Sequence, residues 1–440
     1  MSAAAIGGLM FLLMFVLVII GVPIFVSMMS TACLGFYLIA GPTMMLTQLT
    51  NAPFTLAASY SYAVLPLFTL MGMLASETGI AEGAYSAART WLAKRRGGLL
   101  YTTVLANAIF GACSGISTAG QIVFAKIALP ELDKYGYERR LSLGCITSSA
   151  SLSTLIPPSI PICMFCLMSG YSIGTTLICG LGTGIFVTLA MFAVIRLMIA
   201  LRPGVVPLVQ EADRHITARE KIASLKLLIP IILLFALIIG GTFLGWFHAT
   251  VGGAIGAAAV IVYAVFKRVP MKKVAKAAWE GGHIFAGIYP IIIAGTIFSR
   301  LITLSGLPGY LIDFFSAASI APWMVYLLVL VYFVFCGCVM DIIASIVISV
   351  PIVFPLLVDS YGYDPFVLII VLVIVSSTAA ITPPIGMGVF TVANATRISP
   401  REIFSGSMPF VIMYILVAIL LIFIPQIVTW LPNVLGVFAS

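Results

Sequence analysis

Two double prolines inside long apolar stretches constrain this chain more than any other feature. Pro157-Pro158 follows Tyr135 by 22 residues, and Pro383-Pro384 follows Tyr361 by 22 residues. The two copies are therefore offset by 226 residues, and in each a Tyr-Gly-Tyr loop precedes an apolar run rich in Ser and Thr. A helix cannot continue its hydrogen bonding through Pro-Pro, because two N–H groups are missing and the rings clash with earlier carbonyls. The sequence thus predicts an internal repeat with one broken helix in each copy.

The composition indicates that these breaks lie within a membrane. Of the 440 residues, 62% are hydrophobic and 8% are charged, and the mean hydropathy is +1.20, far from the values of soluble domains. Many apolar segments are long enough to cross a hydrocarbon core of roughly 30 Å. In lipid, a helix break persists only where protein or a polar cavity satisfies the freed carbonyls. Paired breaks in the two halves of a membrane protein point to the binding site of a transporter.

The net charge of +8 does not indicate a nucleic-acid partner, because the basic residues are confined to short segments between apolar ones. Twenty of the 22 Lys and Arg residues fall in 81–98, 131–140, 196–226, 267–282 and 397–403. The positive-inside rule assigns these segments to the cytoplasm. We therefore expect a multi-pass membrane protein with both termini on the side opposite the cytoplasm.

The charge map and the repeat predict an all-α polytopic membrane protein made of two inverted repeats, each with three scaffold crossings, an interfacial arm, a re-entrant hairpin, a broken helix and a final helix. The first repeat, 1–200, has scaffold helices in 6–76, the arm in 80–96, the hairpin in 99–130, the broken helix in 141–170 and the last helix in 173–200. A cytoplasmic linker, 201–226, follows. The second repeat, 227–430, has scaffold helices in 227–303, the arm in 308–321, the hairpin in 323–358, the broken helix in 366–396 and the last helix in 404–424.

Several short motifs give the chain a resemblance to a known family over essentially its whole length. They are Phe110-Gly111-Ala112 with Ser114-Gly115, Pro130-Glu131, Gly136-Tyr137, Ile156-Pro157-Pro158-Ser159, Asp341, Asp364-Pro365 and Ile381-Thr382-Pro383-Pro384. With the length and the repeat spacing, these residues resemble the large membrane subunit of TRAP (tripartite ATP-independent periplasmic) transporters, the DctM-like family. Gly120-Gln121 and Lys126 depart from the family, which usually has small residues after the first hairpin tip.

The resemblance implies a mechanism and partners that the residues alone do not establish. It implies an elevator-type secondary transporter of the bacterial inner membrane, driven by sodium, with both termini in the periplasm. Such a transporter works with a small four-helix membrane subunit and receives its substrate from a periplasmic binding protein. Substrates of the family are organic acids such as C4-dicarboxylates, sialic acid, sugar acids and sulfonates. No cofactor is expected, and sodium would be the only metal bound.

Hydroxyl side chains gather at both breaks and are candidates for sodium binding. Sodium is a hard cation that prefers oxygen ligands, and hydroxyls together with carbonyls freed by proline supply them without a buried negative charge. The candidates are Ser114, Ser148, Ser149, Thr154, Pro157, Gly337, Asp341, Ser376, Ser377, Thr378, Thr382 and Pro383. The alternative is that the hydroxyls bond to the preceding helical turn, and that Asp341 caps a half-helix of the second hairpin.

A second group of polar residues could contact an anionic substrate. It comprises Ser117, Thr118, Lys126, Ser345, Asn394, Thr396 and Arg300. Lys126 has an alternative role, in which its side chain extends to the cytoplasmic face, and Arg300 could instead pair with Asp313.

The function that these observations predict is sodium-coupled import of a small organic acid. A stand-alone carboxylate transporter without a binding protein is the main alternative. An intramembrane enzyme is not favoured, because the sequence offers no pair of intramembrane acids, no His cluster and no Ser–His or Ser–Lys pair at a recognisable spacing.

Overall fold

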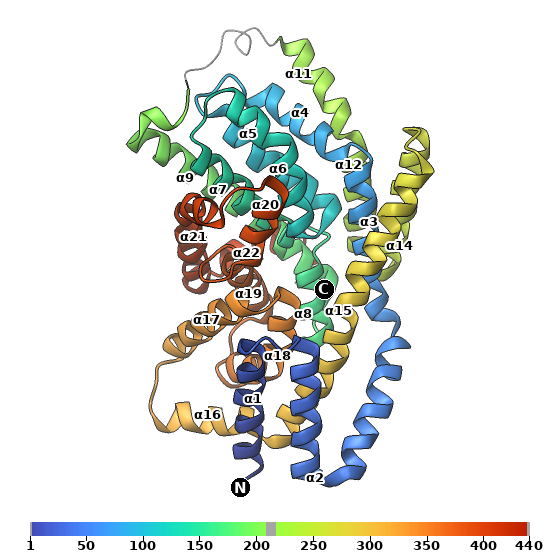
Figure 1. Cartoon of the computed structure of the whole chain (residues 1–440), viewed down its shortest axis with the longest axis vertical. Helices are drawn as coiled ribbons and strands as arrows, with labels where there is room; N and C mark the ends of the chain where they lie inside the picture. Colours follow the sequence, from blue (N-terminus) through green and yellow to red (C-terminus); the bar gives the residue numbers. More distant parts are fainter. Residues whose placement is uncertain (1, 208–216, 438–440) are drawn as a thin grey trace.

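The computed structural model describes residues 2–207 and 217–437, and every regular element within them is a helix. Eight of these helices are long and apolar enough to cross a membrane, and a bent pair of helices, Tyr60–Glu77 with Ile80–Leu92, would make a ninth span. The structure thus confirms an all-helical, multi-pass membrane protein. Figure 1 shows the helices arranged along one long axis, with the N-terminus at one end.

The chain begins with two long helices that lie at the same end of the molecule (Figure 1). Helix α1 (Ala3–Ile19) ends before Gly21, whose φ of 99° reverses the chain, and α2 (Ile24–Ala57) starts after Pro23. The predicted break at Gly-Val-Pro is therefore present. Helix α2 is kinked at Gly41, where φ is 81°. Pro42 occupies the first position of the helical segment after the kink, where a backbone N–H has no partner within the helix, so proline is tolerated there.

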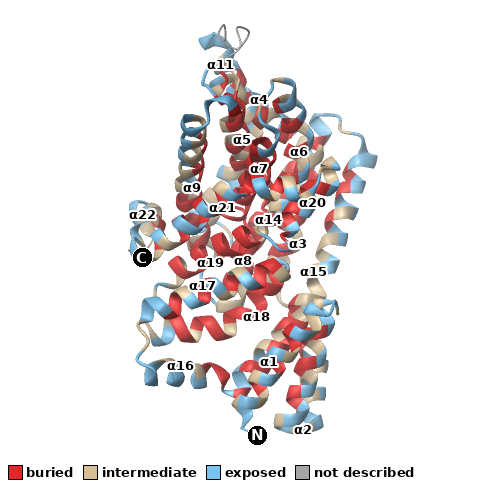
Figure 2. Ribbon diagram, turned by 60° about the vertical axis from the view of Figure 1, so that its left-hand side comes forward, coloured by how far each residue is buried: buried red, intermediate tan, exposed pale blue. Residues whose placement is uncertain are grey.

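Two short helices form arms at opposite ends of the long axis (Figures 1 and 2). Helix α3 (Val64–Glu77) leads into α4 (Ile80–Leu92) through a bend of 65°, and α15 leads into α16 (Leu307–Ala317). Gly79 and Gly306 make the two bends in the left-handed conformation, with φ of 76° and 71°. Glycine adopts this conformation without steric cost, so each arm can change direction within one residue.

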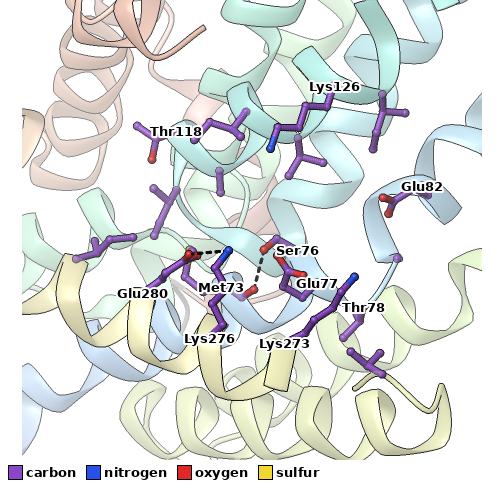
Figure 3. Close-up of a pocket in the computed structure, with 18 of the residues that line it drawn as sticks. Met73, Ser76, Glu77, Thr78, Glu82, Thr118, Lys126, Lys273, Lys276 and Glu280 are labelled. Atoms are coloured by element: carbon purple, nitrogen blue, oxygen red, sulfur yellow. Dashed lines mark hydrogen bonds and ion pairs between the residues drawn. The ribbon is translucent and has the colours of Figure 1, made fainter. Parts of the chain in front are cut away.

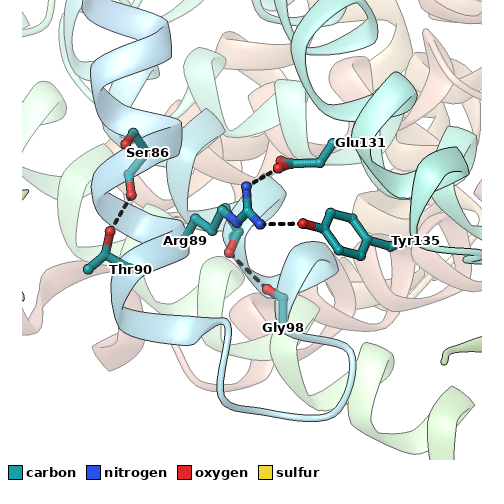
Figure 4. Close-up of polar contacts among 7 residues, drawn as sticks. Ser86, Arg89, Thr90, Gly98, Glu131 and Tyr135 are labelled. Carbon is teal, nitrogen blue, oxygen red and sulfur yellow. Dashed lines mark hydrogen bonds and ion pairs between the residues drawn. The ribbon is translucent and has the colours of Figure 1, made fainter. Parts of the chain in front are cut away.

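The first arm is fastened to the first hairpin by a polar contact (Figure 4). The Arg89 guanidinium on α4 forms an ion pair with Glu131, and it donates a hydrogen bond of 2.7 Å to the hydroxyl of Tyr135. Its charged group also lies 5.4 Å from the centre of the Tyr135 ring. The ion pair is half-buried, with exposures of 30% and 19%, so solvent screens it only partly.

The rest of the first half forms a hairpin, a broken helix and a long helix. They are α5 (Gly98–Ser114), α6 (Ser117–Lys134), α7 (Arg139–Ser149), a 3-10 turn (Ala150–Thr154), α8 (Ile160–Ser169) and α9 (Ile173–Leu201). Side-chain caps start the helices after each interruption: Ser159 accepts a hydrogen bond from the N–H of Ile162, and Ser172 accepts one from the N–H of Thr175.

Part of the predicted linker is helical. Helix α11 (Ala218–Leu225) starts with a capping box, in which Thr217 and Glu220 satisfy each other's backbone N–H groups. The linker residues 208–216 lie outside the described part of the chain. The second half then begins with α12 (Ile229–Phe235), a π-helical turn (Ala236–Gly240), α13 (Gly241–Phe243), α14 (Ala249–Phe266) and α15 (Met271–Ser305).

The hairpin, the broken helix and the last long helix predicted for the second repeat fall in the remaining elements. These are α17 (Pro322–Val339), α18 (Ile342–Phe354), a π-helical turn (Pro355–Ser360), α19 (Pro365–Ala379), α20 (Met387–Thr396) and α21 (Pro400–Phe423). A further helix, α22 (Gln426–Val434), was not predicted from the sequence.

The helices that lead into the two breaks are buried over most of their length (Figure 2). Every residue of α7 from Leu141 to Ser149 is buried, and so is every residue of α19 from Val367 to Ala379. The core therefore surrounds the hydroxyl-rich ends of these two helices.

Candidate functional site

The tip of the first hairpin packs directly on the first break. Helix α5 ends at Ser114, and Gly115 turns the chain with a φ of 64°. A Cβ atom at Gly115 would collide with the carbonyl of Pro158, and the carbonyl of Gly115 accepts a long hydrogen bond, 3.4 Å, from the N–H of Ile160. Pro157-Pro158 is a cis peptide, as is Pro383-Pro384 in the other half. Glycine is therefore required at this position by both conformation and space.

The same packing contact occurs in both halves at the offset of 226 residues. A Cβ atom at Gly111 would lie 3.0 Å from the Cα of Ser153, and one at Gly337 would lie 2.5 Å from the Cβ of Ala379. In each hairpin, a glycine of the first helix (α5 or α17) thus packs against the residues just before the double proline. The missing side chains allow the backbone of each hairpin to approach its break closely.

The two breaks meet each other in the core. The hydroxyl of Thr154 lies 2.7 Å from the hydroxyl of Ser377, although the two residues are 223 positions apart. Helix α21 adds to the junction, because the hydroxyl of Tyr414 donates a 2.9 Å hydrogen bond to the carbonyl of Ser148. These contacts bring together candidates that the sequence could place only in separate halves.

Several buried oxygens on the first hairpin and on the segments that lead into the two breaks have no hydrogen-bond partner within the described residues. They belong to Asn107, Ser114, Gln121, Ser148, Ser153 and Ser376. All six residues are at most 1% exposed. Buried polar groups are normally paired, so a cluster of unpaired oxygens requires an explanation such as a bound ion or water. Neutral oxygens of this kind are suitable ligands for a monovalent hard cation.

Three of these six residues were predicted and three were missed. Ser114, Ser148 and Ser376 were sodium candidates, whereas Asn107, Gln121 and Ser153 were not. The position of Asn107 carried a usable signal: it precedes Ser114 by seven residues, two turns of the same helix, and is the only amide in α5. Ser153 lies in the same hydroxyl cluster before the first double proline, but nothing in its neighbours, Leu152 and Thr154, distinguished it from the other hydroxyls there.

The remaining sodium candidates already have partners, or lie at the edge of the junction. Ser149 accepts a 2.7 Å hydrogen bond from the Asn107 amide, and Thr378 and Thr382 bond to the carbonyls of Ile374 and Thr378 in their own helical turns. Asp341 caps α18, accepting a 3.0 Å hydrogen bond from the N–H of Ile343. The capping role that the sequence left open for Asp341 is therefore the one the structure displays. Pro383 closes the second break, where its carbonyl lies 3.6 Å from the Cys338 sulfur.

A cleft with a volume of about 690 Å³ opens beside the first hairpin (Figure 3). Thr118 and Lys126 lie on its α6 wall, and Ile122 lies between them, so the three form one stripe at a spacing of four residues. The opposite wall belongs to the ends of α3 and α15 and carries Glu77 and the pair Lys276–Glu280, whose charged atoms are 3.6 Å apart. Lys126 thus lines a cleft between the hairpin and the scaffold helices.

The other substrate candidates do not converge on this cleft. Ser117 is half-buried at the start of α6, and Ser345 is buried in α18, where it donates to the carbonyl of Asp341 at 3.1 Å. Asn394 is exposed near the end of α20, and Thr396 donates to the carbonyl of Val392.

Arg300 lies apart from the other candidates. It is in the last two turns of α15, near the end of the molecule that holds α16 (Figure 1), and it donates a 2.8 Å hydrogen bond to Gln48 of α2. The expected pairing with Asp313 is therefore replaced by a contact with α2, which packs along α15.

Comparison with solved structures shows a related fold. The crystal structure of the Alcanivorax borkumensis YdaH transporter, described as having an unusual topology, superposes with a TM-score of 0.59 over 86% of this chain and 88% of that one. The sequence identity is 16%, so the likeness concerns the fold alone.

Comparison with known sequences is more specific. This chain is 27% identical to a C4-dicarboxylate TRAP transporter large permease protein of Pseudomonas aeruginosa, over 87% of this chain and 88% of that one. It is 28% identical to the ectoine/5-hydroxyectoine large permease protein of Ruegeria pomeroyi, over 96% and 98% of the two chains. The family model described as the DctM component of tripartite ATP-independent periplasmic transporters matches residues 11–427. The chain therefore belongs to the DctM family, the large permease subunits of TRAP transporters.

Proposed function

We propose that this permease uses a sodium gradient to import a small carboxylate-bearing solute, and that sodium binds among the neutral oxygens where the two helix breaks meet. The single observation that carries the proposal is the set of unpaired, fully buried oxygens on the first hairpin and on the segments that lead into the two breaks, which meet at the Thr154–Ser377 contact. Sodium bound among these atoms would satisfy some of them and would join the first hairpin to the two breaks. Half-helix ends and unwound carbonyls supply ion sites in other secondary transporters.

The movement that we propose is an elevator motion of the hairpins and broken helices past the scaffold. The cleft between α6 and the α3 and α15 helices separates these two groups, and it is lined by charged residues on both walls. Gly79 and Gly306, in left-handed conformations, are the points at which the arms could turn. The basic segments at the end that holds α4 and α11 support a cytoplasmic location for this end, and hence for the cleft.

The substrate and the partners are proposed from the family. The relatives are named for C4-dicarboxylates, for ectoine and 5-hydroxyectoine, and for sialic acid, the last at 26% identity in Haemophilus influenzae. We propose a carboxylate-bearing solute because Lys126 and Thr118 lie where such a solute would leave through the cleft. A small membrane subunit and a periplasmic binding protein would complete the transporter in the inner membrane.

The test is uptake into proteoliposomes that contain this chain and a candidate small subunit. Labelled dicarboxylates, ectoine and sugar acids would be offered under an inward sodium gradient, with and without the binding protein. We expect uptake that requires both sodium and the binding protein. Uptake by this chain alone would support a stand-alone transporter, and uptake that is indifferent to sodium would refute the sodium site.

Two matched substitutions locate the site. Ser114→Ala and Ser376→Ala each remove an unpaired buried oxygen, and each should raise the sodium concentration for half-maximal uptake by roughly tenfold. Thr188→Ala is the control, because the Thr188 hydroxyl bonds only to the carbonyl of Gly184 in its own helix, at 2.7 Å. An equal sodium dependence in all three variants would exclude the proposed ligands.

A further inference from the structure

An apolar groove with a volume of about 720 Å³ runs between α9 and α21 on the outside of the molecule. Its walls are built from Leu, Ile, Val and Met side chains, together with Pro409 of α21 and Arg202 at the end of α9. Leu201, Ile412 and Leu416 are 73%, 55% and 61% exposed, so none of the described residues covers the groove. In a membrane, lipid chains or another protein would fill such a space.

The charge of the groove lies at one end. Arg202 is the only charged residue of its lining and follows the last residue of α9. A second guanidinium reaches the same loop, because Arg96 donates a 2.6 Å hydrogen bond to the carbonyl of Pro203, the residue after Arg202. Both arginines are exposed and belong to the basic segments that the positive-inside rule assigns to the cytoplasm. This end of the groove is therefore suited to an anionic group at the membrane surface.

The length of the groove matches one leaflet. Its α21 wall runs from Pro409 to Leu420, about 16 Å at 1.5 Å per residue. Half of a hydrocarbon core of roughly 30 Å is about 15 Å. Acyl chains lying in the groove would thus reach the middle of the bilayer while their headgroup stayed beside Arg202.

A second apolar groove provides an internal contrast. It lies between α1, α16, α17 and α18, has a volume of about 360 Å³, and has no charged residue in its lining. It is situated at the end of the molecule opposite α4 and α11 (Figure 1). If the grooves only contacted the acyl chains of bulk lipid, both should bind lipids without regard to the headgroup. If a headgroup is recognised, only the groove with Arg202 should prefer an anionic lipid.

We propose that the groove between α9 and α21 binds an anionic phospholipid of the inner leaflet, with the phosphate of the lipid on Arg202. Both helices pack on the buried helices that lead into the breaks: α21 contacts α7 and α19, and α9 contacts α19. The lipid therefore binds to the part of the molecule that holds the candidate site. This proposal concerns lipid binding alone and stands whether or not the sodium site is correct.

The test is native mass spectrometry of the purified full-length chain titrated with phosphatidylglycerol or phosphatidylethanolamine. The unaltered chain should bind one phosphatidylglycerol molecule more tightly than phosphatidylethanolamine. Arg202→Ala should weaken phosphatidylglycerol binding about fivefold, the usual contribution of one basic residue near a membrane surface, and Arg202→Lys should retain most of it. Equal phosphatidylglycerol binding by the unaltered chain and Arg202→Ala, or no preference between the two lipids, would overturn the proposal.

A second variant tests the groove without altering charge. Ile412→Trp would fill the groove from an exposed position and should reduce binding of both lipids, whereas Leu12→Trp in the uncharged groove should leave the preference for phosphatidylglycerol unchanged. Unchanged lipid binding by Ile412→Trp would overturn the proposal. So would loss of the bound lipid when the small membrane subunit is added, because the groove would then be a protein interface.

Discussion

The contact between Thr154 and Ser377 allows a direct measurement of how strongly the two halves are joined at the site. Thr154→Val keeps the shape of the side chain but removes its hydroxyl, which lies 2.7 Å from the Ser377 hydroxyl and donates to the carbonyl of Ser151 at 2.7 Å. The change leaves two buried groups with one partner fewer, so we expect a loss of about 1–2 kcal/mol in the free energy of unfolding. Ser377→Ala should cost about 1 kcal/mol, because Thr154 keeps its bond to Ser151.

The double variant separates the shared bond from the other effects. Thr154→Val with Ser377→Ala loses the bond between them only once, so its cost should fall below the sum of the single costs. The difference is the coupling energy, which averages about 0.6 kcal/mol and reaches about 1.7 kcal/mol for hydrogen bonds inside membranes. Thr154→Val with Thr188→Val is the control pair. The Thr188 hydroxyl bonds only within α9, so the free-energy costs of these two substitutions should add without a coupling energy.

The assay is reversible unfolding in mixed micelles at increasing fractions of dodecyl sulfate, followed by tryptophan fluorescence. The chain has five tryptophans, which supply the signal. Costs that add to within about 0.3 kcal/mol would refute the argument, because the two breaks would then not be held together by this bond.

Three further outcomes follow from the packing. Gly337→Val should lower the free energy of unfolding by about 1–3 kcal/mol, because its new side chain would collide with Ala379. The control is Gly287→Ala, which should not lower it, because no atom lies within 4 Å of the new Cβ. Equal free energies of unfolding for the two variants would contradict the packing argument. Arg89→Gln should lower the free energy of unfolding by about 1–3 kcal/mol in the same assay, because Glu131 and Tyr135 lose a charged partner. A change below about 0.5 kcal/mol would show that this contact does not hold α4 against the first hairpin. Lys126→Cys should react with an impermeant maleimide in inside-out vesicles, because Lys126 lines the open cleft. Ala125→Cys should not react, because Ala125 is only 3% exposed. Reaction of Lys126→Cys only in right-side-out vesicles would show that the cleft opens to the opposite side of the membrane.

The sequence alone determined the features that depend on neighbouring residues. The two double prolines located both breaks, because a missing N–H and a fixed φ act on the backbone wherever they occur. The glycine and serine motif at 114–115 located the tip of the first hairpin, because the turn requires a residue that accepts a positive φ. The hydroxyl clusters before the prolines marked the helix ends that meet in the core.

Only the tertiary structure decided which of these groups lie together. Thr154 and Ser377 touch across 223 residues, and Asn107 and Ser153 join them because two glycines allow α5 and α6 to approach the break. Arg300 bonds to Gln48 of α2, 252 residues away in the sequence, and not to Asp313, which is much nearer in the sequence. The physical reason is that backbone restrictions are local, whereas contacts between side chains depend on how distant helices pack. The groove that ends at Arg202 likewise arises from two helices that are far apart in the sequence.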